Sequence, residues 1–264
     1  MNPKRNEMPY RMINAERLNR ILNALQANKT VSVSELSKEL NVSTNTIRRD
    51  LQRLEEAGIV IRTHGGAVLV EQAAVELPFH LLAVRYLEEK KRIAARAVQM
   101  INEGDTVILD AGTTTGEIAK LLKLKKGITV ITNAINVVAE LCYCRHIEVI
   151  VTGGVIRTVN NCLVGSLARQ TIERFHVDKL FLSTGGVDLQ IGLTNTNTDE
   201  VEIKQAMIQA AKEKILVATH DKFGQIALAP FASLDVLDKI ITDNGLDPEY
   251  AAALRARGID VLLC

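Results

Sequence analysis

The chain contains few cysteines, and those it has form no pattern of metal ligands. Its 264 residues include four of them: Cys142, Cys144, Cys162 and Cys264. Cys142 and Cys144 lie close to His146, but a Cys-x-Cys pair with one histidine matches no strong zinc spacing. We therefore expect buried or incidental thiols, no metal site, and the reducing environment of the cytoplasm.

Long hydrophobic runs are also missing from the sequence. A membrane-spanning helix needs about 20 consecutive apolar residues, and no run of that length occurs. Residues 1–11 are polar and basic, and they lack the apolar centre of a signal peptide. These absences predict a cytoplasmic protein that has no membrane partner.

Several cofactor and catalytic motifs are absent as well. No Gly-x-Gly-x-x-Gly follows a strand pattern, and no P-loop lysine motif is present. Ser/His/Asp and Cys/His triads have no local signature, and the five histidines are not spaced like metal ligands. The sequence therefore predicts no cofactor and no catalytic centre.

Length and charge distribution indicate two domains of different character. A chain of 264 residues with 47% hydrophobic residues is too long for one small DNA-binding module and can bury a sizeable core. Its net charge is only +1. Residues 1–70, however, carry 11 Lys and Arg against 7 Asp and Glu, whereas residues 71–264 carry 21 against 24. This asymmetry fits a basic DNA-binding domain joined to a mildly acidic one.

The segment from Val42 to Gly58 has the pattern of a helix that enters the major groove of DNA. Ser43 is a suitable N-cap, because its hydroxyl can accept a hydrogen bond from a free backbone N–H in the first turn. Gly58 stands where a helix C-cap is expected. Three apolar residues recur at helical spacing and would share one buried face: Ile47, Leu51 and Leu54.

Polar side chains occupy the rest of this predicted helix. Arginine forks suit guanine edges and phosphates, and the amides of asparagine and glutamine suit adenine. On an ideal helix the side chains of Asn45, Arg49 and Gln52 fall roughly opposite the apolar face. We predict DNA contacts from Ser43, Thr44, Asn45, Thr46, Arg48, Arg49, Gln52 and Arg53.

Two helical patterns precede this segment and a hairpin pattern follows it. Residues 15–27 form an amphipathic pattern, and a second helix is expected after a Ser34 cap. This is the order of a helix-turn-helix, whose second helix enters the groove. Residues 59–62 and 67–70 flank a Thr-His-Gly-Gly turn, where Arg62 and His64 could reach phosphate or the minor groove. The hairpin could instead only pack on the helices, but we favour a DNA-contacting wing.

Residues 71–92 are predicted to be a connector, and residues 93–264 an α/β domain. Pro78 prevents a continuous helix from the wing. Beyond the connector, the sequence predicts short apolar strands at 106–109, 128–132, 147–152, 179–183, 215–219 and 239–242, which alternate with helical patterns, and an edge strand at 259–263. Alternation of this kind implies a mostly parallel sheet with helices on both faces.

Several of these strands end in polar or glycine residues. In open α/β sheets, ligands bind beyond the carboxyl ends of the strands. Gly112 and the three threonines after it open a helix directly after a strand, where free backbone N–H groups favour an anion such as phosphate. The threonines could instead simply cap the helix. The predicted effector pocket comprises Asp110, Gly112, Thr113, Thr114, Thr115, Thr132, Asn133, Gly153, Gly154, Lys204 and Lys222.

Individual members of this pocket have alternative roles. Asp110 could accept a hydrogen bond from a sugar hydroxyl, or it could bond the backbone of its own turn. Lys204 and Lys222 could each neutralise a phosphate, or they could be ordinary surface lysines. These alternatives stay open at the level of the sequence.

The motifs together resemble the DeoR family of bacterial transcription regulators. In the first domain the likeness rests on residues 42–50, 54, 58 and 62–67, and in the second on residues 104–115, 132–133, 153–154 and 221–224. It covers the chain from about Ala15 to the end, and two independent domains agree in order and spacing. Residues 238–248 look most like the branch that controls sugar-alcohol use, such as the glucitol-operon repressor.

This resemblance implies a function and partners. Family members typically repress operons for carbohydrate uptake and catabolism, and they release DNA on binding a phosphorylated sugar. The implied partners are operator DNA, a phosphorylated sugar or sugar alcohol, and further copies of the chain as a homo-oligomer, dimer or tetramer. A two-fold operator also needs paired DNA-binding domains.

The family resemblance also supplies the main alternative, an enzyme. The sensor domain of the family is similar in fold to ribose-5-phosphate isomerase, which needs clustered carboxylates in an Asp-Gly-Ala-Asp-Glu pattern. The comparable residues 183–188 are Ser-Thr-Gly-Gly-Val-Asp, so only Asp188 offers a carboxylate for general-base catalysis. Many relatives also carry aspartate near position 185, where this chain has Gly185. We therefore expect ligand binding without turnover, and the missing glycine fingerprint disfavours a dinucleotide-binding redox sensor.

Overall fold

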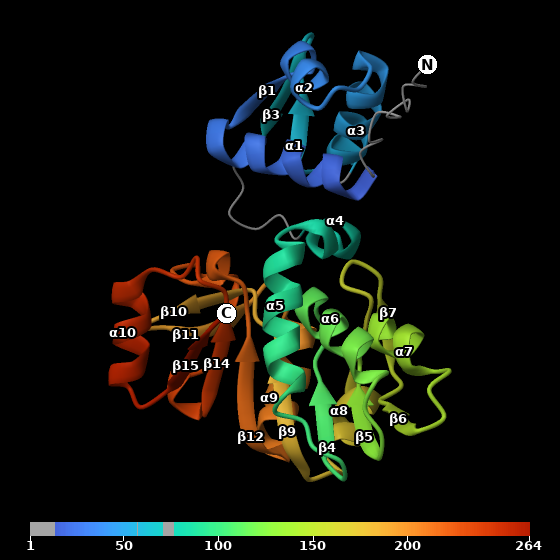
Figure 1. Cartoon of the computed structure of the whole chain (residues 1–264), viewed down its shortest axis with the longest axis vertical. Coiled ribbons are helices and arrows are strands. Elements are labelled where there is room, and N and C mark those ends of the chain that lie inside the picture. Colours follow the sequence, from blue (N-terminus) through green and yellow to red (C-terminus); the bar gives the residue numbers. More distant parts are fainter. Residues whose placement is uncertain (1–13, 57, 71–76) are drawn as a thin grey trace, which may run out of the picture. The chain divides into compact units, whose positions relative to one another are not determined.

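The structure, a computed structural model, describes residues 14–56, 58–70 and 77–264 (Figure 1). The chain divides into two compact units, Met1–Arg85 and Tyr86–Cys264, which we call the first and the second unit. This division differs from the predicted connector, because helix α4 (Phe79–Val84) belongs to the first unit and helix α5 (Leu87–Val98) to the second.

The first unit is built from four helices and a small sheet in its described part. In chain order its elements are α1 (Asn14–Asn28), β1 (Thr30–Ser32), α2 (Val33–Glu39), α3 (Thr44–Glu56), β2 (Val60–Arg62), β3 (Gly66–Leu69) and α4. The predicted helix-turn-helix corresponds to α2 and α3, and the predicted hairpin to β2 and β3. Strand β3 lies between β1 and β2, and both pairings are antiparallel.

One hydrophobic core holds the first unit together. Helix α3 contributes the three predicted residues, Ile47, Leu51 and Leu54, and each is fully buried. Leu81 of α4 is buried in the same core, which explains why α4 belongs with this unit. Burying each such side chain contributes about 1.5–3 kcal/mol to folding.

Two local features of the first unit differ from the sequence expectations. Helix α2 begins one residue before Ser34, so Ser32 occupies the N-cap position and Ser34 lies inside the first turn. Strand β1 is absent from the sequence expectations. It lies so close to Gly66 that this position must be a glycine. A Cβ added at Gly66 would lie 1.8 Å from the carbonyl oxygen of Val31 on that strand, so no larger residue fits.

The second unit is an α/β fold around a parallel sheet of seven strands. The sheet order is β15-β14-β12-β9-β4-β5-β6, and all six pairings are parallel. Its strands are β4 (Thr106–Leu109), β5 (Ile128–Thr132), β6 (Ile147–Val151), β9 (Val177–Leu182), β12 (Ala211–Val217), β14 (Lys239–Thr242) and β15 (Asp260–Leu263). The predicted parallel sheet and the edge position of the last strand are confirmed.

Helices cover both faces of this sheet. Alternate residues along each strand point to opposite faces, and they form two separate cores. One core packs α5, α6 (Thr113–Leu122) and α7 (Ile135–Leu141) on residues such as Val107 and Val130. The other packs α8 (Ser166–Ile172), α9 (Thr198–Ala210) and α10 (Pro248–Ala256) on residues such as Ile108 and Ile131. Figure 1 shows α5 and α6 in front of the central strands.

Smaller elements at the carboxyl ends of the strands complete the second unit. Strands β7 (Val155–Arg157) and β8 (Cys162–Val164) form a hairpin after β6. Strands β10 (Gly186–Asp188), β11 (Gly192–Asn195) and β13 (Ala229–Ala232) form a small antiparallel sheet. Two short 3-10 helices, His220–Lys222 and Leu234–Val236, lie between the later strands. Across the described ranges of both units, no helix is long and apolar enough to cross a membrane.

Candidate functional site

Helix α3 begins and ends as the sequence predicts. The backbone N–H of Thr46 donates to the hydroxyl of Ser43 at 3.2 Å, so Ser43 caps the first turn. Gly58 adopts a φ of +70°, and its N–H donates to the carbonyl of Glu55 at 2.8 Å. A left-handed glycine with such a bond is a common helix end, and it turns the chain directly into strand β2.

The polar residues of α3 form an exposed surface. Among the predicted DNA-contacting residues of this helix and its cap, only Thr46 is half-buried; the exposed ones are Ser43, Thr44, Asn45, Arg48, Arg49, Gln52 and Arg53. Within the described part of the chain, neither Arg48 nor Arg49 has an ion-pair partner. The free guanidinium groups of α3 are therefore available to an anionic partner.

Other residues of this surface have protein partners. The side chain of Gln52 donates to Glu56 at 3.0 Å. On the wing, the backbone N–H of Arg62 donates to Glu55 at 3.1 Å, and its guanidinium lies 3.8 Å from the same carboxylate. These contacts fix the wing against α3. His64 is exposed at the tip of the hairpin.

Asp50 is a structural residue of α3 that the sequence reasoning missed. It is 1% exposed on the otherwise apolar face of the helix. The guanidinium of Arg17 on α1 donates to its carboxylate from Nε at 2.5 Å and from Nη2 at 3.2 Å. Arg53 lies 3.9 Å from the same carboxylate. This buried pair fixes α3 against α1, and an acidic residue among buried apolar ones was the signal that could have revealed it.

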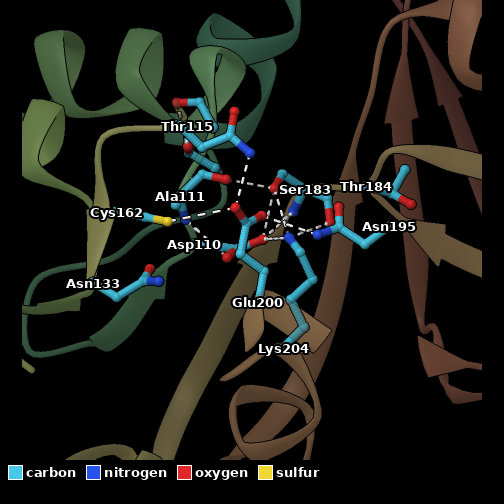
Figure 2. A network of polar contacts seen from close by, with 12 residues as sticks. Asp110, Ala111, Thr115, Asn133, Cys162, Ser183, Thr184, Asn195, Glu200 and Lys204 are labelled. Atoms are coloured by element: carbon cyan, nitrogen blue, oxygen red, sulfur yellow. Dashed lines mark hydrogen bonds and ion pairs between the residues drawn. The ribbon is translucent and has the colours of Figure 1, made fainter. Parts of the chain in front are cut away.

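Asp110 is the centre of a polar network in the second unit, at the carboxyl end of β4 (Figure 2). Its Oδ1 accepts from the N–H of Ala111 at 2.8 Å. Its Oδ2 accepts from Lys204 Nζ at 2.5 Å, and from the hydroxyl and N–H of Ser183 at 2.7 and 2.9 Å. Protein donors therefore reach both oxygens of this carboxylate, and one of the contacts is the predicted bond to its own turn.

Lys204 is a buried residue of α9 rather than a surface lysine. Its side chain is 3% exposed, and Nζ also donates to the carbonyl and hydroxyl oxygens of Ser183 at 3.0 and 2.9 Å. Asp110 and Lys204 are 94 residues apart in the sequence. Ser183, at the end of β9, was not among the predicted pocket residues, although it ends a predicted strand at the same edge of the sheet.

A second acidic centre, Glu200, lies beside this network and was also missed. One of its oxygens accepts from Arg157 at 2.9 Å and from Asn160 at 2.8 Å, and the other accepts from Asn195 at 2.9 Å. The thiol of Cys162 lies 3.6 Å from the same carboxylate, and burial together with this negative charge raises the pKa of the thiol. Cys162 is therefore held as the neutral thiol.

The three threonines after Gly112 form the first turn of helix α6, as the sequence predicts. Thr115 is fully buried and its hydroxyl donates to the carbonyl of Gly112 at 3.0 Å. Thr114 is 7% exposed, and Thr113 is half-buried in the first turn. Only Thr113 combines partial exposure with a position at the start of the helix.

Two asparagines near this helix start carry buried acceptor oxygens without a hydrogen-bond partner among the described residues. The amide nitrogen of Asn133 donates to the carbonyl of Leu163 at 3.1 Å, and that of Asn136 donates to Gly112 at 3.2 Å. Within the described residues, the Oδ1 atoms of Asn133 and Asn136 receive no hydrogen bond. Unpaired buried polar atoms are uncommon and call for an explanation, and a ligand that donates hydrogen bonds is one.

The remaining predicted pocket residues have varied environments. The hydroxyl of Thr132 is fully buried and bonds the backbone at Leu109 and Ala134. Gly153 and Gly154 have φ values of +71° and +113° at the end of β6. Lys222 lies 3.8 Å from Asp221, with no contact to the network around Asp110 in the described structure.

Asp188, the one carboxylate left for an isomerase mechanism, closes a turn instead. Its Oδ1 accepts from the N–H groups of Gln190 and Ile191, both at 2.8 Å. These bonds, with that of Ile191 the larger cause, lower the pKa of the carboxyl below its usual value. A depressed pKa is the opposite of what a general base near neutral pH needs. Throughout the part of the chain that the structure describes, no three or more His, Cys, Asp or Glu side chains form a group that could hold a metal.

Comparison with protein families matches both units. Residues 17–73 match the DeoR-like helix-turn-helix domain, and residues 85–244 match the DeoR C terminal sensor domain. The two matches together cover most of the chain in the order that the sequence motifs indicated.

Known relatives align over nearly the whole chain. The chain is 37% identical over 250 residues to the uncharacterized HTH-type transcriptional regulator YulB of Bacillus subtilis, covering 95% of this chain and 96% of that one. It is 39% identical over 251 residues to the regulator GlpR of Haloferax volcanii, covering 95% and 98%. It is 35% identical to the repressor GlcR of Bacillus subtilis, covering 96% and 97%.

Similar solved structures are more distant. They include ribose 5-phosphate isomerase A of Methanocaldococcus jannaschii, at 13% identity and a TM-score of 0.40 over 53% of this chain and 56% of that one. The sorbitol operon regulator SorC of Klebsiella pneumoniae matches at 11% identity and a TM-score of 0.41, over 92% and 100%. The relatives that align over nearly the whole chain are named as transcriptional regulators and not as enzymes. With both of its units matched and relatives above 30% identity along almost its whole length, the chain belongs to the DeoR family of helix-turn-helix transcriptional regulators.

Proposed function

We propose that this regulator represses an operon for uptake or catabolism of a sugar or sugar alcohol, and that a phosphorylated form of that compound releases it from the operator. The exposed surface of α3 supports the DNA-binding part of this proposal. On it, Arg48 and Arg49 have no ion-pair partner in the described structure. Relatives named as repressors, GlcR and the putative aga operon repressor, support repression. Because a repressor acts where its operator DNA is, we propose that this regulator acts in the cytoplasm.

The start of α6 supports a phosphorylated effector. Its first backbone N–H groups have no partner within the helix and favour an anion. Thr113 is half-buried in this turn and can donate from its hydroxyl. Asn133 directly follows β5 and Asn136 lies in α7, and the Oδ1 atom of each has no hydrogen-bond partner among the described residues. Both atoms are acceptors, so they suit the hydroxyl donors of a sugar. The phosphate of the effector would bind at the start of α6, and its hydroxyl groups would bind the two asparagines.

Release by an effector requires differential affinity. An effector shifts the regulator away from DNA only as far as it binds the free form more tightly than the operator-bound form. Typical couplings of about 1–3 kcal/mol change operator affinity roughly 5- to 150-fold. The sugar-alcohol branch indicated by residues 238–248 remains a prediction.

A thermal-melt screen of the full-length protein tests the effector. Hexose phosphates, hexitol phosphates and glycerol 3-phosphate are each compared with the unphosphorylated parent compound. A ligand at about a hundred times its dissociation constant adds about 2.7 kcal/mol to stability. We expect one ester to raise the melting temperature while its parent does not, and Thr113→Val to reduce the shift. If no ester shifts the melt, the phosphate assignment is wrong.

Selection from a random duplex library tests DNA binding independently of the effector. We expect recovery of a two-fold operator whose binding weakens steeply with salt, because phosphate contacts release counterions. Addition of the ester found in the melt screen should then release the duplex. Failure to recover any sequence would contradict the proposed DNA-binding function.

A further inference from the structure

Tyr86 has an unusual backbone conformation at the point where the chain passes from one unit to the other. The first unit ends at Arg85, and Tyr86 is the first residue of the second unit and the N-cap of α5. Its φ and ψ are 52° and 39°, in the left-handed region, where a bulky residue is a genuine outlier. The other non-glycine residues with positive φ in the described ranges are Lys29, Asn41 and Asn161, so Tyr86 is the one aromatic residue among them.

The side chain of Tyr86 packs against His220, which follows strand β12. The two ring centroids are 4.8 Å apart and the ring planes meet at 70°. This edge-to-face arrangement is favourable for two aromatic rings. A strained backbone persists only where the surrounding structure holds it, and strain of this kind is concentrated at switch regions and ligand sites. The contact with His220 therefore helps to hold Tyr86 in its left-handed conformation.

His220 is itself fixed by the buried carboxylate of Asp243. The backbone N–H of His220 donates to Oδ1 of Asp243 at 2.8 Å, and the ring Nδ1 donates to Oδ2 at 2.7 Å. Asp243 is 2% exposed and also accepts from the N–H of Gly245 at 3.0 Å. A Cβ added at Gly245 would lie 2.6 Å from Nδ1 of His220, so this close packing requires glycine. The imidazole is thus held from two sides and gives Tyr86 a firm surface to pack on.

His220 also begins the turn that carries Lys222, one of the predicted effector-binding residues. Residues His220–Lys222 form a 3-10 helix directly after β12. The N–H of Lys222 donates to the carbonyl of Thr219 at 3.0 Å, and the N–H of Phe223 donates to the carbonyl of His220 at 3.1 Å. The side chain of Lys222 is 26% exposed, so an anion can reach it. Because the two residues belong to one short hydrogen-bonded turn, a displacement of Lys222 also displaces the imidazole.

We propose that the contact between Tyr86 and His220 couples effector binding to the junction of the two units. A phosphate that draws Lys222 toward it shifts the turn and moves the imidazole away from Tyr86. The left-handed conformation then loses its support, and the backbone at the start of α5 relaxes. Relief of this strain in the effector-bound form supplies part of the differential affinity that release from DNA requires. The inference rests on the proposed function, because it needs an effector that reaches Lys222 and an operator that is released.

Operator binding by the full-length protein, measured with and without the ester found in the melt screen, tests this coupling. We expect the ester to weaken operator binding roughly 5- to 150-fold in the wild-type chain and in Tyr86→Phe, which keeps the ring. Tyr86→Asn removes the ring but tolerates the left-handed conformation. His220→Asn removes the imidazole but keeps an N–H donor for Asp243. Both asparagine variants should lose most of this factor, while the ester should still raise their melting temperatures.

Fluorescence reports the contact directly and does not depend on operator binding. The chain contains no tryptophan, so Tyr86→Trp carries a single one. Its emission should change when the ester or inorganic phosphate is added, because the indole loses its contact with the imidazole of His220. Tyr143 provides the matched controls, since it is 90% exposed and follows α7. Tyr143→Trp should show no change in emission, and Tyr143→Asn should release the operator as the wild-type chain does.

Two results would overturn the coupling and leave the proposed function intact. One is a full response of operator binding to the ester in both Tyr86→Asn and His220→Asn. The other, which decides if either variant fails to fold, is an unchanged Tyr86→Trp emission at ester concentrations that raise its melting temperature. If no ester shifts the melt of the wild-type chain, the proposed effector class is wrong. Inorganic phosphate is then the remaining probe, and an emission that it leaves unchanged overturns the coupling as well.

Discussion

Two groups of basic side chains, one in each unit of this regulator, have opposite environments. On α3 of the first unit, Arg48 and Arg49 are exposed, with no ion pair in the described structure. In the second unit, the side chain of Lys204 is buried and lies at hydrogen-bond distance from Asp110 and Ser183. An exposed charge without an ion pair is available to bind an external partner. A buried charge with partners inside the protein contributes first to the stability of the fold.

This contrast determines what substitutions can be expected to do. Removing a free arginine leaves no unsatisfied group behind, so binding changes and stability does not. Removing one member of a buried pair leaves the other uncompensated, so stability changes first. Surface variants elsewhere are expected to stay within about 0.5 kcal/mol of wild type.

The largest expected effect is that of Lys204→Met. It leaves the carboxylate of Asp110 buried without its cation, and breaking such a pair costs about 3–5 kcal/mol. Urea unfolding measures the loss. Lys91→Met is the control, because Lys91 pairs with the exposed Glu88 and such surface pairs contribute little to stability. Equal losses in the two variants would contradict the structural role of Lys204.

Arg49→Ala comes next, and it should act on binding alone. Loss of one specific base contact costs about 1–3 kcal/mol, or roughly 5- to 150-fold in operator affinity. Fluorescence anisotropy with the selected duplex measures this change, and the melting temperature should remain that of wild type. Arg96→Ala is the charge-matched control, because Arg96 is exposed and lies on α5 of the second unit. Wild-type affinity in Arg49→Ala would show that the assigned DNA-binding surface is wrong.

Ser43→Ala should have a smaller effect that is confined to the first unit. Loss of the cap on α3 costs about 1 kcal/mol, because the N–H of Thr46 loses its side-chain acceptor. Amide hydrogen exchange in α3 should accelerate accordingly. Ser34→Ala is the comparison, since Ser34 lies inside the first turn of α2 and does not cap it. The cap assignment fails if both variants accelerate exchange equally.

The smallest expected effect belongs to Asp188→Asn. The pKa of Asp188 is lowered by the N–H groups of Ile191 and Gln190, so its carboxylate stabilises the fold above the usual value of 3.8 and loses this contribution as the pH falls through the folded pKa. Melting temperatures of variant and wild type should differ slightly at neutral pH and converge in acid. A difference that grows as the pH falls would contradict this sign. The response to the effector should stay unchanged.

The first unit was largely predictable because its signals are local. Ile47, Leu51 and Leu54 recur at helical spacing, and a single serine and a single glycine mark the ends of α3. Strand β1 was missed because its three residues find their partner in β3, more than thirty residues later. Such a short segment has no pattern of its own without that partner.

The second unit was predictable in its strands but less so in its polar interior. Strands β4, β5 and β14 match their predicted ranges, because buried parallel strands appear as short apolar runs. The contact between Asp110 and Lys204 spans 94 residues, and no local pattern reports it. The threonines after Gly112 were expected to open a helix, and they form the first turn of α6. The roles assigned to pocket and DNA-contacting residues remain predictions.

Cys162 gives this regulator an internal chemical reporter. Thiol reagents react with the thiolate, and only where they have access, whereas this sulfur is fully buried beside Glu200 with its pKa raised. Alkylation of Cys162 must therefore wait for the surrounding structure to open, while the exposed Cys142 reacts at once. The rate of the slow labelling phase therefore reports how often the second unit opens. A compound that binds and stabilises the closed unit should lower this rate.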